Sequence, residues 1–236
     1  MKNESTPIYG KATEAIDAGL RKYMVDLFGN MSAGLALTAF VAYAIASSPA
    51  AIGFVFSSPI IPILLMIATL GMVIYLSARI HKMSAQTART LFISYAALNG
   101  VTLSSIFLVY TGTSIVSTFF VAAAMFLSMT IYGYATDRDL TKFGSLLFMG
   151  LLGLIIASVV NFFLHSSGFS LAISAIGVVL FTGLTAYDMQ RIKSFYLESD
   201  GTEIAEKKAI FGALALYLDF INLFLHILRL LGDRRD

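Results

Sequence analysis

One stretch of the chain decides its fold: residues 209–231 read AIFGALALYLDFINLFLHILRLL. The hydrocarbon core of a bilayer is about 30 Å thick, and a helix needs roughly 20 residues to cross it. Steps of three, four and three residues place Asp219, Asn222, His226 and Arg229 along one helical face, and the opposite face is Leu, Ile and Phe. A helix with one polar face is expected at the centre of a bundle, with that face turned away from lipid.

Six more apolar stretches precede this one, and the composition agrees with a membrane protein. Of the 236 residues, 58% are hydrophobic and 13% are charged, against about 25% charged in an ordinary soluble domain. We therefore predict an all-α polytopic membrane protein with seven transmembrane helices, of which the seventh is central. The other six helices are expected near residues 28–48, 60–79, 90–110, 114–134, 143–164 and 168–188.

The predicted organisation is a tail, a membrane domain and a short end. Residues 1–27 mix basic and acidic side chains without an apolar core, which indicates a cytosolic tail and not a signal peptide. Residues 28–231 are expected to form the membrane domain and residues 232–236 a short C-terminal tail, and the connector 189–208 is expected to be a loop. The net charge of +2 is too small to indicate a nucleic-acid partner, and the absence of cysteine excludes disulfides and thiolate metal sites.

Lysine and arginine are distributed unevenly between the loops. Thirteen of the 16 lie in the N-terminal tail and in the connections after the second, fourth and sixth stretches. Loops rich in these residues stay in the cytosol, so the N-terminus is predicted to be cytosolic. Arg229, Arg234 and Arg235 conflict with this rule if the seventh stretch crosses fully. We favour the full crossing, and the alternative is a re-entrant segment that returns the C-terminus to the cytosol.

Two acidic residues stand out in the apolar stretches. Asp188 lies at the cytosolic end of the sixth stretch, and Asp219 lies near the middle of the seventh. Intramembrane carboxylates are costly and often mark an ion or proton path. Because the two helices are antiparallel neighbours, we expect the carboxyl groups to meet and share a proton, as a pH sensor and gate. Their oxygens could also hold Ca²⁺ transiently, and the simpler interpretation of Asp188 is a hydrated residue at the interface.

Other polar residues are weaker candidates. Most intramembrane polar groups only join helices by hydrogen bonds, and an arginine near a helix end can extend its side chain to the headgroups. Arg79, at the end of the second stretch, could neutralise the acid pair as a latch or act as an ordinary cytosolic anchor. The candidates for lining a path are Tyr95, Asn99, Thr102, Asn222, His226 and Arg229.

Several motifs resemble a known family. They are Leu184-Thr-Ala-Tyr-Asp188, Ala215-Leu-Tyr-Leu-Asp-Phe-Ile-Asn-Leu-Phe-Leu225, Leu228-Arg-Leu-Leu-Gly232, Asn99-Gly-Val-Thr-Leu103 and Val160-Asn-Phe-Phe163. The chain resembles the transmembrane Bax inhibitor motif family, in its bacterial inner-membrane branch, over nearly all residues after the N-terminal tail. The resemblance implies a central seventh helix and a pH-sensitive calcium leak gated by aspartates at the positions of Asp188 and Asp219. It also implies a latch arginine on the second helix, with Arg79 as the candidate, and in some bacterial members modulation of a membrane-bound AAA protease.

These residues and motifs indicate three alternative functions. The favoured one is a non-enzymatic, pH-sensitive calcium leak without a cofactor, whose partners are the lipid bilayer, calcium ions and protons. The second is an interaction protein whose cytosolic tail or loops restrain a membrane-bound protease. The remote third is an intramembrane aspartyl protease, since a shared-proton dyad serves hydrolysis. The Gly-x-Gly-Asp motif of those proteases is absent, because Tyr217 and Leu218 precede Asp219.

Overall fold

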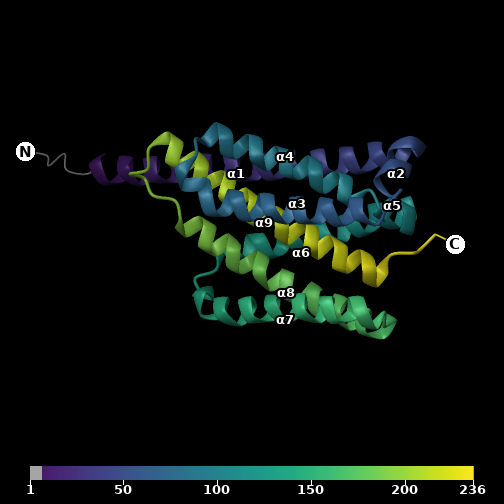
Figure 1. Cartoon of the computed structure of the whole chain (residues 1–236). Coiled ribbons are helices and arrows are strands. Elements are labelled where there is room, and N and C mark those ends of the chain that lie inside the picture. Colours follow the sequence, from purple (N-terminus) through teal and green to yellow (C-terminus); the bar gives the residue numbers. More distant parts are fainter. Residues whose placement is uncertain (1–6, 236) are drawn as a thin grey trace, which may run out of the picture.

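The computed structural model describes residues 7–235, and the side chains from residue 18 onward. Within that range, seven helices are long and apolar enough to cross a membrane, as the sequence predicts (Figure 1). The long helices are α1 (Pro7–Ser47), α3 (Ile60–Arg79), α4 (Ala85–Leu103), α6 (Gly112–Ala135), α7 (Gly144–Leu164), α8 (Ser167–Ser194) and α9 (Thr202–Leu231). Short elements join them: α2 (Pro49–Val55), η1 (Ile80–Lys82), α5 (Ile106–Val109) and η2 (Leu140–Phe143).

Local capping explains where several helices begin. The hydroxyl groups of Ser84, Thr111 and Ser166 accept hydrogen bonds from backbone amides three residues later, at the starts of α4, α6 and α8. Such caps satisfy amides that have no partner inside the helix. Between α7 and α8 the chain turns at His165, whose φ of 52° is left-handed. Two apolar stretches that nearly follow one another are thereby separated into two crossings.

Helix α9 lies at the centre of the bundle. It packs against α1, α4, α6 and α8, and in Figure 1 its yellow ribbon runs through the middle of the molecule, with α7 at one edge. Of the 18 residues that form the most apolar stretch of α9, 67% are buried. The corresponding stretches of α3 and α7 are each 6% buried. The predicted central position of the seventh helix is confirmed. The outer helices α3 and α7 instead expose apolar side chains, which in a membrane face lipid.

The last described residues lie at the end of the bundle opposite the start of α1. The amide of Thr111 donates to the carbonyl of Asp233 at 3.0 Å, and the amide of Arg235 donates to the carbonyl of Val109 at 2.9 Å. The amide of Asp233 also donates to the hydroxyl of Ser114 at 2.8 Å. These bonds hold residues 233–235 beside the connection that precedes α6, at the opposite end of the bundle from the start of α1 (Figure 1). Helix α9 therefore runs the full length of the bundle, as the full crossing requires.

Two predicted segments contain helix that the sequence did not indicate. The connector predicted at 189–208 is mostly helical, because α8 continues to Ser194 and α9 begins at Thr202. In the predicted tail, residues 1–6 lie outside the described residues, and residues 7–27 belong to helix α1. Tyr23 and Leu27 are buried there, and the Tyr23 hydroxyl donates to the carbonyl of Ile192 at 3.3 Å. Packing against the other helices thus extends helices through charged sequence that hydropathy alone leaves out.

The approach of α6 to α8 gives a test of this packing. A Cβ on Gly133 would clash with the backbone of Ala186, whereas a Cβ on Gly153 meets nothing within 4 Å. Alanine favours a helix over glycine by about 1 kcal/mol, so Gly153→Ala should leave the melting temperature in detergent unchanged or raised. Gly133→Ala should lower it, because overpacking costs about 1–3 kcal/mol. Equal melting temperatures for both variants would contradict the close approach.

Candidate functional site

Asp219 lies in the middle of the central helix. Its side chain is 5% exposed, and its Oδ2 atom is buried without a hydrogen-bond partner among the described residues. A buried charge without a partner is strongly unfavourable. A carboxyl group in this position is therefore sensitive to any charge or proton that comes near it.

Asp188 is the second acid that the sequence singles out. It is half-buried on α8, and α8 packs along α9. The structure thus places the two helices that carry Asp188 and Asp219 side by side, and the meeting of their carboxyl groups stays a prediction. Ion pairs in the described chain join Lys22 to Asp26 and Lys208 to Asp200, and neither of them includes Asp188 or Asp219. Neither acid is therefore neutralised by a salt bridge within the described residues.

Arg191 is the basic residue that follows Asp188 most closely on α8. It lies three residues after Asp188, a spacing that places both side chains on one face of the helix. The sequence predictions did not include Arg191, although this spacing could have identified it. Arg79 is the last residue of α3 and is exposed. It takes part in neither of the described ion pairs. Its role as a latch stays a prediction.

Tyr217 is the centre of a second polar cluster, which joins α1, α4 and α9. The Tyr217 hydroxyl shares a 2.8 Å hydrogen bond with the hydroxyl of Thr38 on α1 and accepts a 2.8 Å bond from the amide of Asn99 on α4. The ring of Tyr95 packs edge-on against Tyr217 at 5.6 Å between centroids, and Thr102 donates to a backbone carbonyl of its own helix. These contacts place Tyr95 and Asn99 in a packed junction. Tyr217 was not among the predicted site residues, although it lies two residues before Asp219.

The polar face of α9 continues into a cavity. This outer cavity has a volume of about 490 Å³ and lies between α7, α8 and α9, toward the end of the bundle that holds the C-terminus. The predicted residues Asn222, His226 and Arg229 all line it, together with Ser158, Asn161, Phe162, Ser170, Ile173 and Leu225.

Several contacts define the character of the outer cavity. Asn161 Oδ1 and His226 Nδ1 are buried without a hydrogen-bond partner in the described chain, and Asn222 donates to the carbonyl of Leu218 at 2.8 Å. The imidazole of His226 stacks on the ring of Phe181 at 5.6 Å. Neither acid of the pair is among the residues that line the cavity. The outer cavity therefore reaches Asn222 and does not include Asp219, which lies about one turn further along α9.

The described residues do not form a site for a tightly bound metal ion. Among them, no group of three or more His, Cys, Asp or Glu side chains is arranged to hold one. Ca²⁺ takes six to eight oxygen ligands when it is bound stably, and the acid pair supplies two carboxyl groups.

Comparison with known proteins places the chain in a family. The model of the family described as "Inhibitor of apoptosis-promoting Bax1" matches residues 20–236. The chain belongs to this Bax1 inhibitor family. It is 51% identical over 220 residues to the inner membrane protein YbhL of Escherichia coli, which covers 92% of this chain and 94% of YbhL. It is also 50% identical over 216 residues to a Borreliella burgdorferi protein, with 91% and 93% of the two chains covered.

The likeness extends across distant bacteria. A Rickettsia prowazekii protein is 47% identical over 223 residues and covers 94% of each chain. The resemblance read from the motifs is thus confirmed at the level of the Bax1 inhibitor family. With seven apolar helices in its described residues and a relative named as an inner membrane protein, this family member is a multi-pass inner-membrane protein.

The junction around Tyr217 gives a stability test. Interhelical hydrogen bonds in membranes contribute about 0.6 kcal/mol each, and Tyr217→Phe removes the two bonds to Thr38 and Asn99. We expect the free energy of unfolding, measured by denaturation in mixed micelles, to fall by about 1 kcal/mol. Tyr43, which is 63% exposed, is the matched control, and Tyr43→Phe should have no effect. A Tyr217→Phe variant as stable as the control would show that the junction does not hold the helices together.

Proposed function

We propose that this protein is a pH-sensitive calcium leak in which Asp188 and Asp219 act as proton sensor and gate. The observation that carries the proposal is the buried, unpartnered carboxyl oxygen of Asp219 on α9, the helix that packs along the helix of Asp188. Two acids that meet in a poorly hydrated site do not ionise independently. Losing a proton from the pair adds negative charge beside the polar face of α9, and that charge attracts a cation.

The direction of the pH response follows from this electrostatic argument. At low pH the pair keeps its protons and offers a cation no net charge. As the pH rises the pair becomes ionised, the carboxylates repel each other, and a divalent cation stabilises the site. The leak is therefore expected to increase with pH. Arg229 is exposed at the mouth of the outer cavity, and its fixed positive charge opposes cation entry there, which suits a slow leak better than a fast channel.

The orientation belongs to the same proposal. The end of the bundle that holds the connections 80–84, 136–143 and 195–201 also carries most of the lysine and arginine outside the N-terminal segment. Under the rule that basic loops stay in the cytosol, this basic end faces the cytosol and the outer cavity faces the opposite compartment. Modulation of a membrane-bound protease and intramembrane proteolysis stay predictions, and no contact of the described residues favours either one.

Flux measurements on carboxyl variants test the gate. In proteoliposomes, the calcium flux of the wild type should increase as the pH is raised, whereas Asp219→Asn should give a flux that no longer depends on pH. Asp188→Asn should weaken the dependence in the same direction, because it removes the interacting charge. The matched control is Asp137→Asn, an exposed acid in the connection after α6, which should behave as the wild type. A full pH response in Asp219→Asn would rule out the proposed sensor.

A second experiment separates Arg191 from Arg79. Arg191 lies three residues after Asp188 on α8, and a nearby positive charge favours an ionised carboxylate, so Arg191→Gln should move the midpoint of the pH response to higher pH. Arg79→Gln should leave the midpoint where it is if Arg79 is only an anchor in the conformation described here. A shift with Arg79→Gln and none with Arg191→Gln would instead assign the latch to Arg79.

A further inference from the structure

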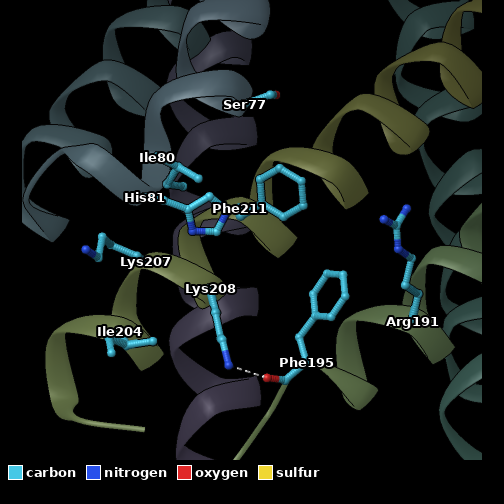
Figure 2. A pocket seen from close by; sticks show the side chains of 9 residues that line it. All are labelled: Ser77, Ile80, His81, Arg191, Phe195, Ile204, Lys207, Lys208 and Phe211. Atoms are coloured by element: carbon cyan, nitrogen blue, oxygen red, sulfur yellow. Dashed lines mark hydrogen bonds between the residues drawn. The ribbon is translucent and has the colours of Figure 1, made fainter.

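A second cavity, the basic-end pocket, lies away from the acid pair. It has a volume of about 500 Å³ and is formed by the end of α3 with η1, the end of α8 and the start of α9. Figure 2 shows its side chains coming from these separate elements. The lining residues are Ser77, Ile80, His81, Arg191, Phe195, Ile204, Lys207, Lys208 and Phe211.

The lining combines apolar walls with positive charge. Ile80 is 2% exposed, and the rings of Phe195 and Phe211 contribute to the walls (Figure 2). The guanidinium of Arg191 lies 5.4 Å from the centre of the Phe195 ring, a cation–π contact that holds it over the pocket. No carboxylate is among the lining residues. A ligand that fits this pocket is amphipathic and negatively charged.

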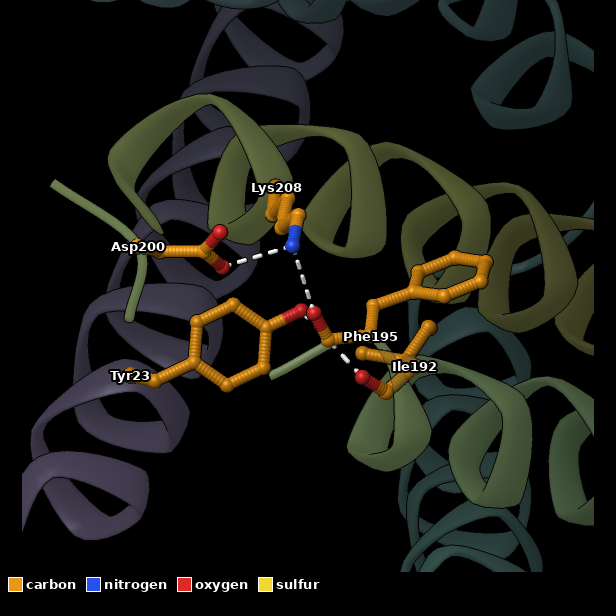
Figure 3. A network of polar contacts seen from close by, with 5 residues as sticks. All are labelled: Tyr23, Ile192, Phe195, Asp200 and Lys208. Carbon is orange, nitrogen blue, oxygen red and sulfur yellow. Dashed lines mark hydrogen bonds and ion pairs between the residues drawn. The ribbon is translucent and has the colours of Figure 1, made fainter. Parts of the chain in front are cut away.

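One of the lysines already has partners, which shows how the wall is fixed. Lys208 Nζ lies 2.6 Å from Asp200 Oδ2 and donates to the carbonyl of Phe195 at 2.8 Å, so it fastens the connection between α8 and α9 (Figure 3). On the other side, Tyr23 ties α1 to the end of α8 through Ile192. The charge of Lys208 is thereby compensated. Arg191 and Lys207 have no salt bridge among the described ion pairs and are the charges available to a ligand.

The position of the pocket indicates the source of that ligand. It lies where the membrane-spanning stretches 60–82 and 167–194 end, the depth at which phospholipid phosphates are found. Ser77 lines the pocket, and Ile74 and Leu70 lie on the same helical face at steps of three and four residues. Ile74 is 59% exposed and Leu70 is 60% exposed. An apolar track on α3 therefore leads from the pocket into the hydrocarbon.

We propose that the basic-end pocket binds an anionic phospholipid, whose headgroup lies between Arg191 and Lys207 on opposite sides of the pocket (Figure 2) and whose acyl chain follows the Leu70–Ile74 face of α3. Phosphate is the shared chemistry of a lipid headgroup and a free phosphate compound. The apolar walls and the track favour the lipid, because a free phosphate gains nothing from burying them. Basic pockets between helices are typical sites for anionic headgroups. The inference is independent of the proposed leak, since it requires only binding.

Lipid retention by the purified full-length protein tests this assignment. The protein is placed in nanodiscs of equal phosphatidylglycerol and phosphatidylethanolamine, and the lipids that remain bound on release are counted by native mass spectrometry. We expect the wild type to retain phosphatidylglycerol preferentially. Each cation near a membrane surface contributes about 1 kcal/mol to such binding, equivalent to about fivefold. Lys207→Gln should therefore lower the preference about fivefold, and the double variant Lys207→Gln, Arg191→Gln should lower it further.

The control double variant is Arg138→Gln with Lys142→Gln. It removes the same charge from exposed positions in another connection at the same end, and it should keep the wild-type preference. Equal retention of the two lipids by the wild type, or an undiminished preference in Lys207→Gln, would overturn the proposal. Displacement of phosphatidylglycerol by inorganic phosphate alone would assign the pocket to a soluble phosphate compound and would equally overturn the lipid. None of these outcomes bears on the calcium flux, so the two proposals fail separately.

Discussion

Asp219 has a carboxyl oxygen that is buried in the middle of the central helix and has no hydrogen-bond partner among residues 18–235. Placing that group there is costly, and the surrounding helices shield it from lipid. Four helices pack against α9, and Asp219 is buried among them. Asp188, the other acid of the proposed pair, is on α8, which packs along α9. Any change in protonation or in the separation of these two helices acts on the same carboxyl pair.

Polar groups along α9 are separated by layers of apolar packing. At the basic end, Lys208 is neutralised by Asp200 and fixes the connection to α8. In the middle, Tyr217 joins α1 and α4 on one side of the helix, and Asp219 follows it. Toward the other end, Asn222 opens the face into the outer cavity. The buried middle of the helix thus separates two hollow ends, and the acid pair lies within that barrier.

Arg191 connects the two ends of this description. Its guanidinium lies over the ring of Phe195 in the basic-end pocket, and it lies three residues after Asp188 on the same face of α8. A ligand anion in that pocket would compete with Asp188 for the same charge. If the proposed leak and the proposed lipid site are both correct, the membrane composition and the proton sensor are linked through this one side chain. Lys208, already held by Asp200, cannot provide such a link.

The sequence by itself determined the number of crossings, the central position of the last helix and the face on which Asp219, Asn222, His226 and Arg229 lie. Hydropathy and helical periodicity are local properties, and a bilayer makes them decisive because every exposed polar group inside it is costly. Tertiary structure alone decided that Tyr95 and Asn99 meet Tyr217 in a packed junction, and that Arg191 and Lys207 line one pocket while Arg79 stays exposed. It also decided that α1, α8 and α9 extend past their apolar segments. These features depend on which helices become neighbours and on how far each side chain reaches, and neither is recorded in the spacing of residues along one helix.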